Sequence, residues 1–309
     1  MILLVTGVML FSQTIGTIEY FEGRVEITRD GRPLRRMDIG FGIENLDQIT
    51  TAPDSLITIS FTPGTGVDGT ITLSEKSSAV IRLDMLSGSK AHDLYLLGGA
   101  VAVKVKRLGG SDSSYRVRTS SSVLGVRGTE FVAAAFFGNS LVACKEGEVS
   151  CRSYVGSAGV SGESSTAVSA VPGRIVEIPD SGSIKTGEFP DGEFYAEWES
   201  LQERWRNFHV ELISADPVIF IDRLASSWEN ARDAVVRHAA VLRKNATASR
   251  WLDAARAGEK KGSRKEWALE RPKVMKDLLA LRPHLVMAVI PWLRIQELRP
   301  LVRPEDQNR

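Results

Sequence analysis

Residues 124–131 read LGVRGTEF, and residues 142–149 read VACKEGEV. In the first stretch two glycines, Gly125 and Gly128, stand among apolar residues, and glycine accepts bends and close backbone contacts that other residues do not. In the second stretch the Glu146-Gly147 pair interrupts an apolar run, as turn signals do. Both stretches therefore predict short strands joined by tight turns.

The same pattern extends through the front of the chain. Val101, Val103 and Val105 alternate with Ala102, Lys104 and Lys106, which predicts a strand with one apolar face and one face that meets solvent. Turn signals at Asp30-Gly31, Pro63-Gly64 and Asp68-Gly69 separate similar runs, and no helical spacer lies between them. The pattern predicts an all-β domain over residues 16–182, either an antiparallel sandwich, which we prefer, or a solenoid-like β stack.

The composition changes at about residue 190. Of the 27 glycines, 24 precede residue 191, whereas all six tryptophans follow it. Phe194, Trp198, Leu201 and Trp205 recur at spacings of three and four, which places them on one helical face. A second helix is predicted to begin at Asp216-Pro217, an acidic cap followed by proline. The chain is therefore predicted to have two domains, the second an all-α helical domain over residues 190–309.

Several ordered pieces of the front half resemble the FecR domain family. They are 16–27, which resembles the family's opening hairpin, and then 47–55, 98–103, 115–119 with 124–131, 146–149 and 171–174. The resemblance implies an envelope location and, in the best-known members, a regulator that relays a signal from an outer-membrane transporter to a cytoplasmic sigma factor. No cytoplasmic segment or transmembrane helix precedes the domain here, so we expect an exported FecR-like protein instead.

The residues of the strongest motif are expected to hold the fold. They are Gly125, Val126, Arg127, Gly128, Thr129, Glu130, Phe131, Glu146 and Gly147. The glycines fit bends, while Val126 and Phe131 fit the core on either side and Arg127 could pair with Glu130. The alternative is that the planar guanidinium of Arg127 binds a carboxylate or phosphate ligand.

The only two cysteines, Cys144 and Cys151, flank the Glu146-Gly147 turn. If the turn closes a hairpin, they lie on the same face of adjacent strands, close to disulfide distance. The alternatives are a disulfide, which an oxidising compartment would permit, or two reduced thiols.

The first eleven residues are apolar and too short to cross a bilayer. Small residues follow them, so residues 1–15 are predicted to be a signal peptide and the protein to be periplasmic or in the cell envelope. The usual basic start is absent, since Arg24 is the first basic residue. The alternative is a buried first strand.

Charge and motifs argue against several classes of function. A net charge of +1 gives no overall field for nucleic acid. Arg282, Pro283, His284 and Pro291 interrupt the apolar run 278–293, which therefore predicts a core helix rather than a membrane span. The four histidines are scattered and lack the companions of a metal or nucleophile site, so we expect no catalytic, metal or cofactor residues.

The sequence thus predicts a non-catalytic exported protein that binds a protein partner in envelope signalling or assembly, by strand addition at a sheet edge or in a groove between domains. The alternative is a structural or glycan (peptidoglycan)-associated envelope protein, which the Ser- and Thr-rich strand faces favour. A glycan hydrolase using paired strand glutamates is the third hypothesis.

Overall fold

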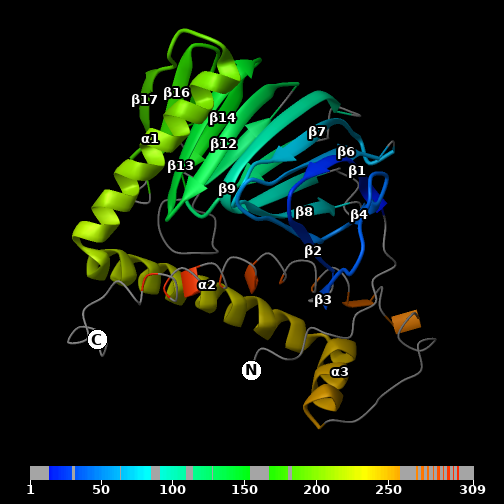
Figure 1. The fold of residues 1–309 in the computed structure, drawn as a ribbon. Coiled ribbons are helices and arrows are strands. Elements are labelled where there is room, and N and C mark those ends of the chain that lie inside the picture. Colours follow the sequence, from blue (N-terminus) through cyan, green and yellow to red (C-terminus); the bar gives the residue numbers. More distant parts are fainter. Residues whose placement is uncertain are drawn as a thin grey trace. The chain divides into compact units, whose positions relative to one another are not determined.

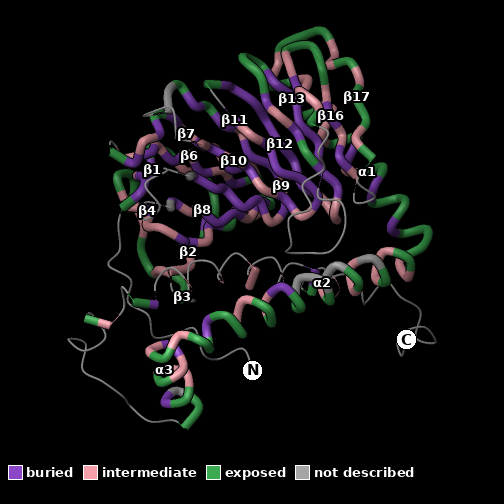
Figure 2. The backbone as a smooth tube through the Cα atoms, turned by 180° about the vertical axis from the view of Figure 1, so that it is seen from behind, coloured by how far each residue is buried: buried purple, intermediate pink, exposed green. Residues whose placement is uncertain are grey.

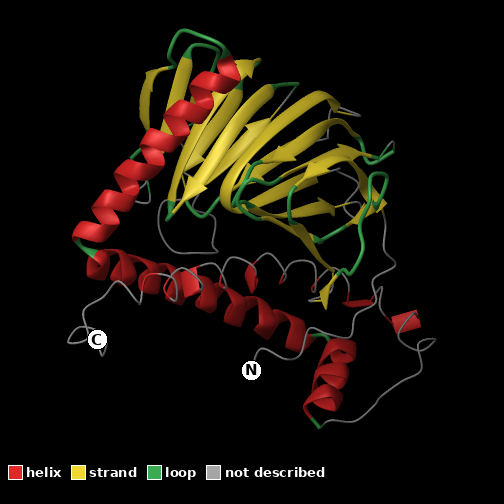
Figure 3. Cartoon of the chain, viewed as in Figure 1, coloured by secondary structure: helices red, strands yellow, loops and turns green. Residues whose placement is uncertain are grey.

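A computed structural model describes residues 14–29, 32–62, 64–84, 91–108, 114–126, 128–153, 167–179 and 183–257, together with isolated helical positions between 269 and 298. Strands occupy this part of the chain up to residue 188, and helices follow from residue 194 (Figure 3). The predicted order, a β domain followed by helices, is confirmed.

The strands form two hydrogen-bonded layers (Figure 1). In order across the sheet, layer A consists of β4 (Gly42–Glu44), β1 (Thr14–Glu22), β6 (Leu56–Phe61), β7 (Val67–Leu73), the second half of β9 (Ala91–Leu108), β12 (Glu130–Phe136), β13 (Asn139–Glu146), β16 (Arg174–Ile178) and β17 (Lys185–Glu188). Layer B consists of β3 (Arg32–Pro33), β2 (Val25–Arg29), β5 (Gln48–Thr51), β8 (Ser78–Asp84), the first half of β9, β10 (Ser114–Arg118), β11 (Ser122–Val126), β14 (Val149–Ser153) and β15 (Val168–Ala170).

The long strand β9 belongs to both layers. Its first half pairs with β8 and its second half with β7 and β12, and the strand passes from one layer to the other at Gly98 and Gly99. Gly99 has a φ of +87°, and a Cβ there would collide with Ser77 on the neighbouring chain segment. Only glycine fits this bend, because other residues rarely adopt that backbone conformation.

Most of the pairings are antiparallel, but β9 and β10 run parallel. The predicted opening hairpin is wrong, because β1 pairs with β4 and β6 in layer A while β2 pairs with β3 and β5 in layer B. Gly23, with a φ of +71°, turns the chain between the layers at that point. The Asp68-Gly69 turn signal is also not a turn but an irregularity within β7, where a Cβ on Gly69 would meet the carbonyl of Lys104.

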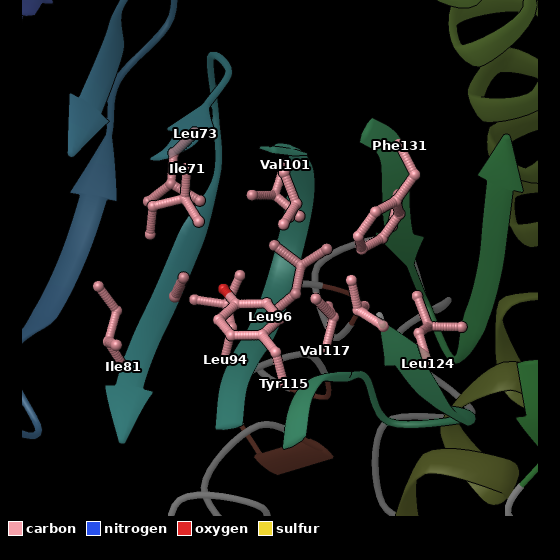
Figure 4. Packing of buried hydrophobic residues seen from close by; sticks show 14 of the residues in the cluster. Ile71, Leu73, Ile81, Leu94, Leu96, Val101, Tyr115, Val117, Leu124 and Phe131 are labelled. Atoms are coloured by element: carbon pink, nitrogen blue, oxygen red, sulfur yellow. The ribbon is translucent and has the colours of Figure 1, made fainter. Parts of the chain in front are cut away.

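One hydrophobic core lies between the layers (Figure 4). Layer A contributes Ile71, Leu73, Val101 and Phe131, and layer B contributes Ile81, Leu94, Leu96, Tyr115, Val117 and Leu124. Every second residue of these strands points inward, as the strand period of two requires. The intervening residues therefore form the two outer faces.

The first helix, α1 (Phe194–Ala215), packs on the outer face of layer A. Trp198 and Trp205 are buried there against Val132, Ala134 and Leu141, in a second apolar cluster. By its contacts, the chain up to Val210 forms one compact unit, apart from residues 156–162. The sequence instead predicted that the helical domain begins at residue 190. The difference arises because the apolar stripe of α1 packs on the sheet. Figure 2 shows that most positions in the strands are buried.

The second compact unit contains residues 211–309 and 156–162. Its helices are α2 (Pro217–Lys244) and α3 (Ala246–Arg256). The predicted start of α2 is confirmed, since the side chain of Asp216 accepts a hydrogen bond from the backbone N–H of Ile219 and Pro217 is the first helical residue. Leu242, Ala248 and Val274 form a small core in this unit. Within the described ranges, every helix is too short or too polar to serve as a membrane span.

Candidate functional site

The motif at 124–131 carries the chain from layer B to layer A. Leu124 and Val126 are buried at the end of β11, and Phe131 is buried near the start of β12. Gly125 lies between the first two and faces outward. Arg127 lies outside the described residues, so its predicted pairing with Glu130 stays a prediction.

Two turns of the motif pack against each other. Gly128 and Gly147 both have left-handed backbone conformations, with φ values of +63° and +86°. A Cβ on Gly147 would lie 2.8 Å from the carbonyl oxygen of Gly128 and 2.8 Å from the Cγ2 atom of Thr129. The two stretches that resemble the family therefore meet in space, and the absence of a side chain at Gly147 allows the contact.

Glu130 joins four elements on the outer face of layer A. Its carboxylate forms ion pairs with Lys104 of β9, at 2.6 Å, and with Lys145 of β13, at 2.7 Å. It also accepts a hydrogen bond from the hydroxyl of Tyr195 on α1, at 2.8 Å. The ammonium of Lys145 lies 4.6 Å from the centre of the Tyr195 ring. This group, here called the Glu130 cluster, fastens the start of α1 to the sheet.

The Glu130 cluster keeps its carboxylate ionised. Burial opposes the charge and on its own raises the pKa of Glu130, but the hydrogen bonds from Lys104, Lys145 and Tyr195 outweigh burial and lower the pKa to about 2. Such a carboxylate cannot serve as a general acid near neutral pH.

A second carboxylate, that of Glu177 on β16, holds α1 further along. It accepts a hydrogen bond from the indole N–H of Trp205, at 3.1 Å, and lies 3.6 Å from Nε2 of His209. The interaction with His209 is the main cause that lowers the pKa of Glu177, against the opposing effect of burial. Sequence reasoning missed both carboxylate clusters, because their members come from strands and helices far apart in the chain.

The cysteines do not lie on a hairpin. Cys144 is on β13 in layer A and Cys151 is on β14 in layer B, and these strands do not pair with each other. Both are buried free thiols, so the disulfide alternative is not what the structure contains. Burial raises the pKa of Cys144 to about 11 and the pKa of Cys151 to about 12. The sequence suggested a hairpin because the turn at Gly147 is tight, but the turn crosses between the layers.

The family model described as FecR protein matches residues 47–150 of the chain. Those residues span β5 to the start of β14 and include both halves of the motif. The resemblance predicted from the sequence is thereby confirmed for these residues. The matched segment includes the bend of β9, the two packed turns and the Glu130 carboxylate.

Two crystal structures of "a putative anti-sigma factor" from Parabacteroides distasonis ATCC 8503 are similar to the chain. One, at 2.50 Å resolution, shares 13% sequence identity, with a TM-score of 0.28 over 46% of this chain and 59% of that one. The other, at 1.65 Å resolution, shares 14% identity, with a TM-score of 0.27 over 47% of this chain and 57% of that one. The chain thus spans less than two thirds of either protein. No curated protein matches the sequence significantly.

Most of the motif residues that the structure describes are buried or closely packed against a turn. Val126, Thr129, Glu130 and Phe131 are buried, and Gly147 is confined by the Gly128 turn. Glu146 is exposed at the end of β13. The arrangement holds two layers and a helix together.

Proposed function

We propose that this protein is a non-catalytic component of envelope signalling or assembly whose FecR domain recognises a protein partner. The observation that carries the proposal is the match of residues 47–150 to the FecR family. The buried, ionised Glu130 and the confined glycines support it, because these motif residues stabilise the domain, and a carboxylate with so low a pKa is not a general acid near neutral pH.

Strand β17 is the edge of layer A at which a partner could be recognised by strand addition. This strand pairs with β16 on one side, and within the described residues no strand pairs with its other side. An extended peptide could add a further strand there through main-chain hydrogen bonds. Lys185 and Glu188 are exposed at the two ends of the edge and would limit which peptides pair with it.

Export to the envelope is part of the proposal. It rests on the apolar residues 1–11, which lie outside the described residues, and on the envelope association of the FecR family. Mass spectrometry of the mature protein tests it, because cleavage near residue 15 would leave a chain without that apolar segment.

The glycan alternative has gained no support. The threonines that motivated it lie on the outer face of layer A, and Thr58 and Thr72 hydrogen bond to each other at 2.9 Å. These two hydroxyl groups already hydrogen bond within the sheet, so their presence needs no glycan ligand to explain it.

Capture from envelope extract tests the proposal. The tagged full-length protein is chemically cross-linked in extract of the producing cells, and the enriched proteins are measured against a tag-only bait. We expect one envelope protein to be enriched, to persist after the peptidoglycan is digested and to be lost after the extract is treated with protease. Enrichment of no protein, together with sedimentation of the chain with purified peptidoglycan, would replace the proposal with the glycan alternative.

A further inference from the structure

The segment from Arg32 to Phe41, here called the edge segment, crosses one side of the β sandwich. Among the described strands, β3 pairs only with β2 and β4 only with β1, so these two strands are the edges of layers B and A on the same side of β9. Leu34, Met37 and Phe41 are partly buried and pack against the core between the layers. All the other residues of the edge segment are exposed. Three side chains therefore close this side of the sandwich, and the rest meet the solvent.

A tight turn at the end of the edge segment presents Ile39 to the solvent. The backbone N–H of Phe41 donates to the carbonyl oxygen of Asp38, at 2.9 Å, and Gly40 has a φ of +84°, as the third residue of a type II turn does. The N–H of Gly40 donates to the carbonyl oxygen of Ile18, at 2.8 Å, which fixes the turn to β1. A Cβ on Gly40 would meet nothing within 4 Å, so the turn projects into open space. Ile39 is 63% exposed, more than any other large hydrophobic residue described in the unit that contains the strands.

Three arginines of the edge segment are exposed and make no polar contact. The side chains of Arg32, Arg35 and Arg36 form no ion pair or hydrogen bond with any residue that the structure describes. The neighbouring Arg29 differs, because the carboxylate of Asp47 holds its guanidinium at 2.7 Å. Arg29 is thus part of the fold, whereas the three exposed guanidinium groups have all of their N–H donors directed to solvent.

The edge segment has a surplus of positive charge. Its single acidic residue is Asp38, whose carboxylate accepts a hydrogen bond from the backbone N–H of Ile39, at 2.9 Å. The ten residues therefore carry a net charge of +2, whereas the whole chain carries +1. Arg35, Arg36 and Ile39 lie within five consecutive residues, so their Cα atoms are no more than about 14 Å apart. Positive charge and exposed apolar surface thus occur together.

The surface of a membrane with anionic lipids satisfies both kinds of side chain at once. Phosphate headgroups attract arginine, and an isoleucine side chain gains free energy by entering the boundary between the headgroups and the acyl chains. An acidic peptide would bind the arginines but would leave Ile39 in water. A nucleic acid is a poorer match still, because the one aromatic residue of the edge segment, Phe41, packs against the core and is not available for stacking with bases.

We infer that the edge segment binds the surface of a membrane that contains anionic phospholipids, with Ile39 among the headgroups and the three arginines on their phosphates. A lipid surface is a different ligand from the protein partner of the proposed function, and the edge segment lies outside the matched residues 47–150. Each arginine near such a surface contributes about fivefold to the partition coefficient, and Ile39 contributes about tenfold. The product is about a thousandfold, which is the strength of a reversible, peripheral contact.

Vesicle sedimentation with the full-length protein tests the inference. Vesicles made of equal parts of phosphatidylglycerol and phosphatidylcholine should bind the protein at low ionic strength, and pure phosphatidylcholine vesicles should bind it much more weakly. The double variant Arg35→Gln/Arg36→Gln should lower the partition coefficient about 25-fold, and Ile39→Ser should lower it about tenfold. Added salt should weaken the binding of the wild type more than that of the double variant. Two controls, Arg174→Gln at an exposed arginine of β16 and Val236→Ser at an exposed valine of α2, should bind as the wild type does.

A fluorescent label gives a second measurement, which does not depend on affinity. Ile39→Cys can be labelled selectively with an environment-sensitive dye, since Cys144 and Cys151 are buried. With anionic vesicles, the emission of this dye should shift to shorter wavelengths, whereas the emission of a dye at Arg174→Cys should stay unchanged. The apolar residues 1–11 are present in every variant, so any binding through them cancels in these comparisons.

Three results would overturn the inference. They are equal binding of anionic vesicles by the wild type and the edge-segment variants, an equal loss in either control, and an unshifted emission of the dye at position 39. Binding of labelled polyglutamate or single-stranded nucleic acid, without binding of anionic vesicles, would also overturn it and assign the edge segment to an acidic macromolecule. Failure of the proposed function is distinguishable, because capture of an envelope protein does not depend on these vesicles.

Discussion

Replacing Glu130 by glutamine should lower the free energy of unfolding of the β unit by about 2 kcal/mol at neutral pH. Lys104 and Lys145 would lose their shared partner, while the hydrogen bond from Tyr195 could be kept by the amide. The pKa of Glu130 falls from 4.5 to about 2 in the folded protein. At 1.36 kcal/mol for each pKa unit, this lowering corresponds to roughly 3 kcal/mol. The two lysine side chains are 51% and 40% exposed, so solvent screening reduces the expected effect.

The effect should depend on pH in a defined direction. Because the folded pKa of Glu130 lies below the unfolded value, the unfolded state takes up the proton first as the pH falls. The stabilisation is therefore complete above about pH 5 and is lost progressively towards about pH 2. The difference between wild type and Glu130→Gln should shrink over the same range.

Chemical denaturation followed by far-UV circular dichroism measures this difference. Glu26→Gln is the matched control, because Glu26 is an exposed strand glutamate on β2, and it should change the free energy of unfolding by less than about 0.5 kcal/mol. If Glu130→Gln is as stable as this control at neutral pH, or if its deficit does not diminish in acid, the Glu130 cluster does not stabilise the domain as described.

Three further predictions concern the turns, the helix contact and the thiols. Gly147→Ala should cost about 2 to 3 kcal/mol in thermal or chemical unfolding, since it adds a collision to the left-handed backbone penalty. Gly173→Ala, at a φ of +81° in open space, should cost only about 1 to 2 kcal/mol, and equal losses would contradict the packing of the two motif turns. Tyr195→Phe should destabilise the β unit by about 1.5 kcal/mol through loss of a hydrogen bond to a charged group, and an unchanged unfolding midpoint would show that α1 is held without it. Cys144 and Cys151 should react with a thiol reagent only after denaturant is added, and an intact mass two hydrogens below that of the reduced chain would instead reveal a disulfide.

The sequence predicted local structure and its order along the chain. The alternation of Val101, Val103 and Val105 identified an inward face, and all three valines are buried in the core. The cap at Asp216 identified the start of α2. These features depend on residues close in sequence, so a short window contains the whole signal.

Which strands are neighbours could not be predicted. Tight turns at Gly23 and Gly147 are typical of hairpins, yet each carries the chain between layers. A glycine in a tight turn can either close a hairpin or carry the chain to the other layer. Packing of the whole core decides which of the two forms. Hence Cys144 and Cys151 were expected on one face and lie in different layers.

The ion pairs of Asp93 were equally hidden. Arg116 and Arg118 alternate visibly in sequence, but their nearness to Asp93 depends on the parallel pairing of β9 with β10. The Glu130 cluster was missed for the same reason, since Lys104, Lys145 and Tyr195 come from three separate elements.

Site-specific photo-cross-linking in the producing cell tests most directly whether the β unit recognises a protein. A photoreactive residue is placed at Ser150 on the outer face of layer B, at Thr72 on the outer face of layer A, and at Thr186 on the β17 edge. We expect an adduct with one envelope protein from at least one of these three positions. If none of the three positions yields a protein adduct while the full-length chain is present in the envelope fraction, recognition of a partner by this domain is contradicted.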